Sequence, residues 1–307
     1  MRENHARARR SPASLGSSAA LTAIGLACLS AALFGAMSVG LRMGLDRYPD
    51  VELATVATVT GALAVALVAA AAEAPARGVH AAAAWPFLLA GLLQPGVGQL
   101  LVTLAIREAG ASRTSVVLGS APLVSVTIAL VLLGEPVRFA LVAGAVLIVA
   151  GGVELARERG RPAHVRRRGY LYAFVATILF SARDNLTRWL AGTTSVPPGV
   201  AGAAALAGGL LFILAVLVPR VRGRVSLRAM VPFLGIGVLF GLSYVSLFEA
   251  FYRGRVTVVS PLVATESLWG VALSILLIRR TELVGRRVLF GTALIVAGGV
   301  LIGIYSG

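Results

Sequence analysis

The sequence is poor in charged residues, in cysteine and in histidine, and it contains no lysine at all. Only 13% of its 307 residues are charged, whereas a soluble domain carries about 25% because its surface must stay hydrated. With 58% hydrophobic residues and a mean hydropathy of +0.88, the chain has too little polar surface to be covered by water. These shortages exclude an ordinary soluble globular protein and predict a protein surrounded by lipid.

The missing residue types also exclude several kinds of chemistry. A single cysteine, Cys28, leaves no partner for an intrachain disulfide and no thiol cluster for a metal. Without lysine there is no Walker A loop, and neither a His-Glu-x-x-His zinc motif nor a Gly-x-Ser-x-Gly elbow occurs. His5, His80 and His164 all fall in the tail or in loops. The sequence therefore predicts no cofactor, no metal site and no enzymatic activity.

All 28 cationic residues are Arg, and the formal net charge is +15. A strongly basic protein often binds nucleic acid. Here the arginines stand in short clusters between apolar runs, and no cluster lies on a soluble segment large enough to present it. Arg at the ends of transmembrane helices, facing lipid headgroups, accounts for the same charge. We therefore expect a lipid bilayer as partner and no nucleic acid.

Ten apolar runs are long enough to cross a bilayer as helices, which takes about 20 residues each. They lie near residues 20–42, 52–73, 84–107, 112–133, 138–156, 170–190, 197–218, 229–251, 257–278 and 286–305. The first run follows several arginines, as the apolar region of a signal peptide does, but it is longer than the ~7–15 residues of such a region. The fold class predicted is an all-α membrane protein with ten transmembrane helices.

The chain also repeats itself. Residues 147–153 (LIVAGGV) recur unchanged at 294–300, and Gly144 matches Gly291 at the same offset. Each half holds five runs, an odd number, so the second half must enter the membrane from the opposite side. The halves are then inverted repeats, an architecture common among secondary transporters, whose substrate sites lie near the membrane midplane.

The repeat predicts four parts. They are a basic N-terminal tail (1–19), a first five-helix repeat (20–156), an Arg-rich linker (157–168) and a second five-helix repeat (169–307). Within each repeat, the glycines spaced seven apart on the fifth helix are expected to let helix backbones approach closely in lipid. Glu135 and Glu282, beside helix ends, are expected to cap or pair locally.

At this point the sequence resembles a family. Ten runs, the duplication and the segment LLGEPVRFALVAGAVLIVAGGV at 132–153 resemble EamA-type transporters of the drug/metabolite transporter superfamily. The matching positions are Pro122, Gly134, Glu135, Gly144, Gly151 and Gly152. The second copy departs from the pattern, with Ser267 or Trp269 in place of the proline and 280–282 (RTE) in place of Gly-Glu. The resemblance implies export or exchange of a small metabolite, amino acid or drug.

Charged residues inside the runs are the first candidates for substrate binding or coupling, because a charge at a helix centre costs about 2.5–3.5 kcal/mol. Glu266 has no charge within one helical turn, and it is expected near its helix centre, facing a cavity, where it exchanges a proton or pairs with a cationic cargo. Asp184 and Arg183 lie together in the sixth run. Alternatively, Asp184 forms a local ion pair with Arg188, four residues on.

Weaker candidates are polar side chains in the same runs. Gln94 and Gln99 flank a Pro-Gly pair that is expected to kink the third helix. Asn185, Ser243 and Tyr244 are expected either to bind solute or to hold helices together. Glu249 lies four residues before an arginine near a helix end, which favours a local pair.

These observations predict a multi-pass secondary transporter of the cell membrane that moves a small solute by alternating access. The alternative is a non-transporting integral membrane scaffold or receptor. The orientation stays open: the arginine distribution favours termini outside the cell, whereas the family resemblance implies cytoplasmic termini.

Overall fold

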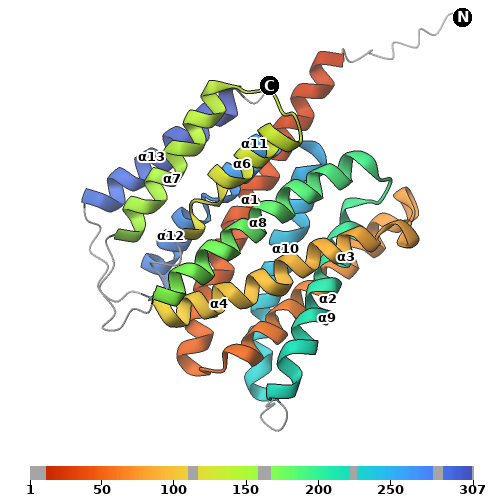
Figure 1. The fold of residues 1–307 in the computed structure, drawn as a ribbon, viewed down its shortest axis with the longest axis vertical. Helices are drawn as coiled ribbons and strands as arrows, with labels where there is room; N and C mark the ends of the chain where they lie inside the picture. The colour runs from red at the N-terminus through yellow and green to blue at the C-terminus, as the bar shows by residue number, and fades with distance from the viewer. Residues whose placement is uncertain (1–11, 110–116, 158–166, 222–226, 279–285, 306–307) are drawn as a thin grey trace, which may run out of the picture.

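The computed structural model describes residues 12–109, 117–157, 167–221, 227–278 and 286–305 (Figure 1). Within these ranges the chain is helical apart from short turns and loops, and it contains no strand. The first half comprises α1 (Pro12–Arg47), α2 (Val51–Arg77), η1 (Ala81–Ala83), α3 (Trp85–Gly91), η2 (Leu92–Val97), α4 (Gly98–Ala109), α6 (Ala121–Leu132) and α7 (Phe139–Arg157). The second half comprises α8 (Arg167–Thr193), α9 (Pro198–Val221), α10 (Leu227–Arg253), α11 (Val256–Val263), α12 (Glu266–Ile278) and α13 (Arg286–Tyr305).

Helix occurs in every one of the ten predicted runs, and the all-α class is confirmed. Five stretches are long and apolar enough to cross a membrane: Ala19–Leu45, Val51–Arg77, Trp85–Val102, Pro198–Leu217 and Arg228–Arg253. The sixth run does not qualify because α8 carries two charged residues and an asparagine in succession, and the ninth is divided into α11 and α12. Ten spans therefore stay a prediction for the remaining helices.

The first helix differs from its predicted boundary. It begins at Pro12, inside the predicted tail, and runs for 36 residues, so its N-terminal end projects beyond the other helices in Figure 1. Its inner face is made of Ala23, Ala27 and Ala31, all buried, and it packs against α10, α11 and α12. The first run is thus an integral helix of the bundle.

The fifth helices of the two halves, α7 and α13, pack as an antiparallel pair (Figure 1). A methyl group placed on Gly144 would lie 2.9 Å from the carbonyl oxygen of Gly298, and one placed on Gly151 would lie 2.5 Å from that of Gly291. Going along α7 from Gly144 to Gly151, the contacted residue of α13 changes from Gly298 back to Gly291, so the two helices run in opposite directions. The expected structural role of these glycines is confirmed, since larger side chains would hold the backbones apart.

Close glycine contacts between a helix of one repeat and a helix of the other also occur elsewhere in the bundle. A methyl group on Gly61 of α2 would lie 2.4 Å from the carbonyl oxygen of Leu234 in α10, and one on Gly208 of α9 would lie 2.2 Å from that of Leu88 in α3. Each contact is the counterpart of the other in the opposite repeat. In the same way α1 packs on α12 where α8 packs on α6. The two repeats are therefore related as an inverted pair requires.

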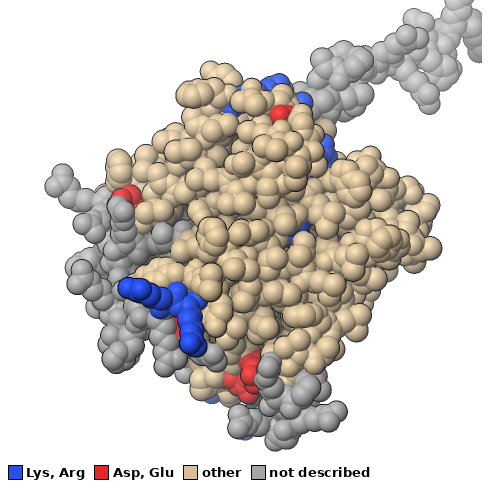
Figure 2. Space-filling view, viewed as in Figure 1, with Lys and Arg blue, Asp and Glu red and all other residues tan. Residues whose placement is uncertain are grey.

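Charged side chains are scarce over the middle of the face shown in Figure 2 and lie mainly near its upper and lower ends. Large apolar side chains stand on the outside, for example Val68 with 71% and Phe139 with 86% of the residue exposed. A monomer in water rarely exposes so much contiguous apolar surface. This surface suits contact with lipid.

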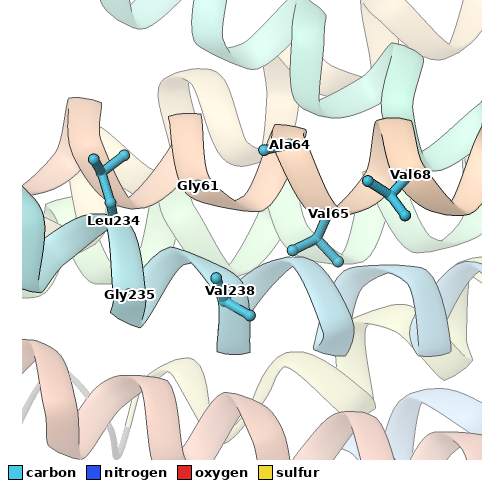
Figure 3. Close-up of a pocket in the computed structure, with 7 residues that line it drawn as sticks. All are labelled: Gly61, Ala64, Val65, Val68, Leu234, Gly235 and Val238. Atoms are coloured by element: carbon cyan, nitrogen blue, oxygen red, sulfur yellow. The ribbon is translucent and has the colours of Figure 1, made fainter.

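A groove of about 470 Å³ lies between α2 and α10 (Figure 3). Glycine and aliphatic side chains line it, among them Val65 and Val68 of α2 and Leu234 and Val238 of α10. It offers no polar group to a polar solute. The candidate site lies instead among buried polar side chains around α8.

Candidate functional site

The third span is broken where the sequence predicted a kink. Gln94 has φ −152° and ψ 122°, so its backbone is extended between α3 and α4, and Pro95 follows it. Gln94 is fully buried. Its backbone carbonyl oxygen accepts a hydrogen bond of 2.8 Å from the hydroxyl of Tyr244 on α10. Gln99, on α4, is also buried. The expected kink is therefore confirmed, with an extended residue at the bend.

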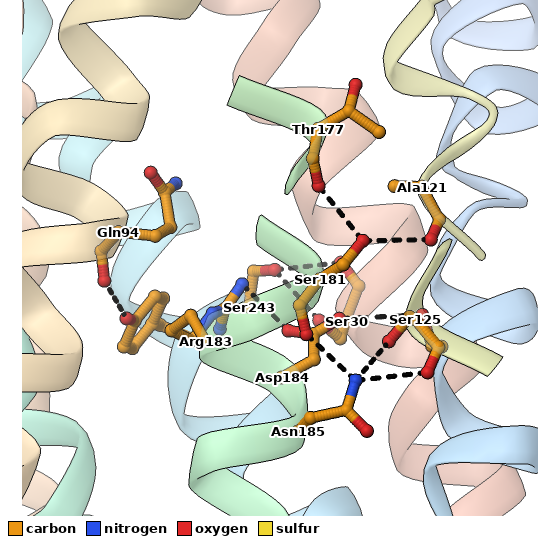
Figure 4. Close-up of polar contacts among 12 residues, drawn as sticks. Ser30, Gln94, Ala121, Ser125, Thr177, Ser181, Arg183, Asp184, Asn185 and Ser243 are labelled. Carbon is orange, nitrogen blue, oxygen red and sulfur yellow. Dashed lines mark hydrogen bonds and ion pairs between the residues drawn. The ribbon is translucent and has the colours of Figure 1, made fainter. Parts of the chain in front are cut away.

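Three consecutive polar residues of α8 form the centre of the site (Figure 4). Nη2 of Arg183 lies 3.2 Å from Oδ1 of Asp184, and Oγ of Ser260 on α11 donates a hydrogen bond of 3.4 Å to Oδ2 of the same carboxylate. The guanidinium carbon of Arg183 stands 5.2 Å from the centre of the Tyr244 ring. Arg183 is buried and the side chain of Asp184 is 13% exposed, and charges so far removed from water are costly unless they are paired. Asp184 thus pairs with Arg183 and not with the alternative partner Arg188, whose Nη1 donates to the carbonyl oxygen of Phe251 at 2.9 Å.

Asn185, the third residue, holds α8 against α6. Its Nδ2 donates to the carbonyl oxygen of Ser125 at 3.0 Å and to that of Ser181 at 2.9 Å. Ser181 in turn donates to the carbonyl oxygen of Ala121 at 3.0 Å (Figure 4). Thr177, Ser181 and Asn185 are spaced four apart, and this helical spacing was the signal in the sequence that could have identified the contact surface.

Ser243 makes the corresponding contact between α10 and α1. Its Oγ donates to the carbonyl oxygen of Ser30 at 2.9 Å and lies 3.0 Å from the Oγ of the same residue. Both serines are buried. These distances favour a role for Ser243 in holding helices together, as they do for Asn185. Sequence reasoning missed Ser30 and Ser260, since a single serine in an apolar run gives no distinctive pattern.

Glu266 does not occupy the middle of a continuous helix. The ninth span breaks at Ala264 and Thr265, and Glu266 is the first residue of α12. No hydrogen bond or ion pair joins its carboxyl group to another described residue, but it is close enough to Asp184 for the two carboxylates to interact electrostatically. The expectation of a helix centre was wrong because the run of apolar residues gives no sign of the break.

The fourth span carries an equivalent break. Oγ of Ser120 donates to the carbonyl oxygen of Val117 at 2.6 Å, and Oγ1 of Thr265 donates to that of Leu262 at 2.6 Å. The two hydroxyl residues occupy matching places in the two repeats, and each precedes a half-helix, α6 or α12. Interrupted helices that meet near a membrane midplane typically form the substrate sites of transporters.

Glu249 lies away from this centre, at the C-terminal end of α10. It forms an ion pair with Arg253, four residues on, and a second with Arg77 of α2 at 3.4 Å. Arg77 also lies 3.7 Å from Glu73, whose Oε2 accepts a hydrogen bond of 3.0 Å from the backbone N–H of Gly199. The favoured local pair of Glu249 is confirmed.

Glu135 caps a helix, as expected, although the helix belongs to the other repeat. Its Oε1 accepts from the N–H of Val256 at 2.9 Å and its Oε2 from that of Thr257 at 3.0 Å, at the start of α11. Glu282 and the residues around it, like the arginines of the linker at 158–166, lie outside the described residues.

Comparison with known proteins agrees with this arrangement. The model of the EamA-like transporter family matches residues 21–154 and again 167–304. No curated protein matches the sequence. Among 29 matching chains of solved structures, one crystal structure is 23% identical, covers 94% of this chain and 98% of its own, and superposes with a TM-score of 0.73. That identity shows a shared fold only.

The chain belongs to the EamA-like transporter family, since two copies of the family unit cover nearly all of it. It is thus an integral membrane protein of a transporter family, for which a small-molecule solute and a lipid bilayer are the partners.

Proposed function

We propose that this protein is a secondary transporter that carries a small solute across the cell membrane by alternating access, in the direction of export or exchange. Ten spans in two inverted halves, residues 20–156 and 169–307, form the carrier. The observation that supports it most is the position of Arg183 and Asp184 on α8, which packs against the interrupted third span and against the half-helices α6 and α11 of the fourth and ninth spans.

Alternating access requires the halves to separate at one membrane face at a time. At the C-terminal ends of α2 and α10, the halves are joined by Arg77 with Glu249 and by Glu73 with the backbone of Gly199. The side chain of Arg77 is 44% exposed, and an exposed ion pair contributes only about 0–1 kcal/mol. Contacts of this strength close a face and still open during a transport cycle.

In this proposal Glu266 and Asp184 are the coupling residues, because an acid that is removed from water must find a cation or a proton. Proteoliposomes containing the purified protein would be screened for flux across candidate solutes. The Glu266→Gln variant is expected to lose transport or its pH dependence, and Glu52→Gln, which changes a carboxylate in the first turn of α2, is the matched control.

Three results would contradict the proposal at different levels. An unchanged rate and pH dependence in Glu266→Gln would remove the coupling role alone. Inverted halves require the α2–α3 loop and the α9–α10 loop to lie on opposite sides of the membrane. Labelling that places both loops on the same side would contradict the inverted halves and the alternating access between them. Absence of flux for every solute tested would identify a scaffold or receptor.

A further inference from the structure

Three side chains of α8 form a row of hydrogen bonds to α6 and to the turn before it, and each of them has two acceptors. Ser181 and Asn185 donate across the contact at 3.0 Å each (Figure 4), and Thr177 does so at 3.3 Å. Each also donates to the carbonyl oxygen four residues earlier in α8, at 2.9 Å in all three cases. The bond within α8 is therefore the shorter one throughout. The acceptors across the contact are the carbonyl oxygens of Val117, Ala121 and Ser125.

These donors do not depend on α6 for a partner. A buried donor is costly when it is left without an acceptor, but the hydroxyl groups of Thr177 and Ser181 and the amide of Asn185 keep one in their own helix if α6 moves away. Gln94 and Arg183 differ, because their buried side chains keep hydrogen-bonding atoms that no described residue satisfies. Interhelical hydrogen bonds in membranes are weak where alternative partners exist. The α6–α8 contact can thus open and close reversibly.

The corresponding contact of the first repeat, α1 on α12, has apolar residues in place of these donors. Leu33 matches Leu179 and Arg42 matches Arg188, which aligns α1 with α8. The positions of the three donors are then occupied in α1 by side chains that cannot donate a hydrogen bond, and all three are buried. They are Ala31 for Thr177, Gly35 for Ser181 and Val39 for Asn185. The two repeats therefore match in fold and differ in how this contact is held.

Close backbone packing holds α1 against α12. A methyl group placed on Gly35 would lie 2.9 Å from the carbonyl oxygen of Glu266 and 2.9 Å from the backbone nitrogen of Gly270. The two contacts are equivalent, because Ser181 bonds the first residue of α6 and its counterpart Gly35 touches the first residue of α12. Small residues hold membrane helices together by van der Waals contact, and that attraction is lost when the helices separate. Nothing within α1 replaces it, since glycine, alanine and valine side chains have no polar group.

The chain bends at both ends of α6. A turn at Gly119 and Ser120 precedes the helix, and Gly134 follows it with φ 62°. Asn185 is next to Asp184 in α8, so the contact that α6 covers leads to the site. We propose that α6 is a gate, whose contact with α8 opens and closes during the transport cycle while α12 stays packed on α1; this deepens the proposed function and rests on it.

Thiol labelling would measure the opening without any solute. Cys28 is the single cysteine of the chain, so the variants are made in Cys28→Ser and reconstituted in nanodiscs, where a charged methanethiosulfonate reagent reaches both membrane faces. Ser125→Cys is the probe, because its side chain is fully buried and the substitution leaves all three donors and their backbone acceptors in place. Val39→Cys is the matched control, at the position equivalent to Asn185 and with the same 4% exposure. Arg168→Cys, at the exposed start of α8, gives the rate of an open thiol.

The expected rates follow from the population of the open gate. A minor conformation is populated to about 0.1–10%, so Ser125→Cys is expected to react about 10- to 1,000-fold more slowly than Arg168→Cys. Val39→Cys is expected to react at least about tenfold more slowly again, because its contact stays closed. Ser125→Cys that reacts no faster than Val39→Cys would overturn the gate. Ala129→Cys, one turn further along α6 and fully buried, is the second probe should Ser125→Cys not fold.

A cross-link across the contact would connect the gate to transport. Nδ2 of Asn185 lies 3.2 Å from Oγ of Ser125, so Ser125→Cys with Asn185→Cys can be joined by a short bifunctional methanethiosulfonate while α6 is seated on α8. Flux of the same candidate solutes is then measured in proteoliposomes before and after linking. Linking is expected to stop flux and dithiothreitol to restore it, and neither single variant should respond to the linker in this way. Flux that continues at the unlinked rate would overturn the gate.

The outcomes separate the gate from the proposed function. If Ser125→Cys is labelled as expected but no solute is exchanged, the movement of α6 stands and the transporter fails. If a solute is exchanged while Ser125→Cys and Val39→Cys stay equally protected, the transporter stands and the gate is wrong.

Discussion

The contact of Glu135 with α11 gives a stability prediction that can be worked through in numbers. Arg255, at the N-cap of α11, provides no capping side chain. Glu135 supplies the cap instead, with one carboxylate oxygen on each of the first two backbone N–H groups, at 2.9 and 3.0 Å. It is also an anion at a helix N-terminus, where it opposes the positive end of the helix dipole. The contact joins the first repeat to the second.

Glu135→Gln keeps one acceptor oxygen and loses the other together with the charge. One charge-assisted hydrogen bond contributes about 1.5 kcal/mol and the dipole about 0.5 kcal/mol, so the expected loss is about 2 kcal/mol. Glu135→Ala removes both bonds, for an expected loss of about 3.5 kcal/mol. Because 1.4 kcal/mol corresponds to a factor of ten, Gln alone should shift the unfolding equilibrium about 30-fold.

The measurement is reversible unfolding of the purified protein in mixed micelles of mild detergent and dodecyl sulfate, followed by circular dichroism. Glu52→Gln is the matched control: it also changes a carboxylate in the first turn of a helix, but its side chain makes no hydrogen bond to a described residue, and we expect a change below about 0.5 kcal/mol. If Glu135→Gln and Glu135→Ala have the same free energy of unfolding as the unaltered protein, the cap contributes nothing and the reasoning about α11 is refuted.

Three further predictions use the same unfolding assay. Gly298→Ala puts a methyl group 2.6 Å from the carbonyl oxygen of Gly144 and should destabilise the protein by about 1–3 kcal/mol. Gly235→Ala is the control, because its methyl group meets nothing within 4 Å and should leave the stability unchanged. Equal stability of the two variants would contradict the close packing of α7 and α13. Tyr244→Phe removes the hydroxyl that donates to Gln94 and should cost about 0.6–1.7 kcal/mol, and the exposed Tyr170→Phe is its control. Arg77→Gln should cost no more than about 1 kcal/mol because the guanidinium is half-exposed, so a larger loss would show that its ion pairs are stronger than their exposure implies.

The periodic and repeated features of this protein could be predicted from the sequence. Long apolar runs specify helices in lipid because only an intrahelical ladder satisfies the backbone there. The glycines around the duplicated segment 147–153 predicted a close helix contact, because small residues at a spacing of seven share one helical face, and the structure shows that the contact joins α7 to α13. Proline beside Gln94 predicted the kink of the third span, since it removes a backbone donor.

The arrangement of the site depends on contacts between residues far apart in the chain. The sequence singled out Arg183, Asp184 and Glu266 but placed Glu266 within a continuous helix and offered Arg188 as the partner of Asp184. Tertiary packing brings Ser260 to Asp184 across 76 positions and Tyr244 to Gln94 across 150. A break at a threonine leaves no mark in an apolar run, because the hydroxyl that satisfies the turn is common in helices as well.

The sequence by itself determined that the chain is helical, that it lies in lipid and that it consists of two related halves, because these properties follow from composition and periodicity. Only the tertiary structure decided which polar side chains hold helices together and which keep unused hydrogen-bonding atoms. That difference depends on the distance to a partner on another helix, and no local pattern encodes such a distance.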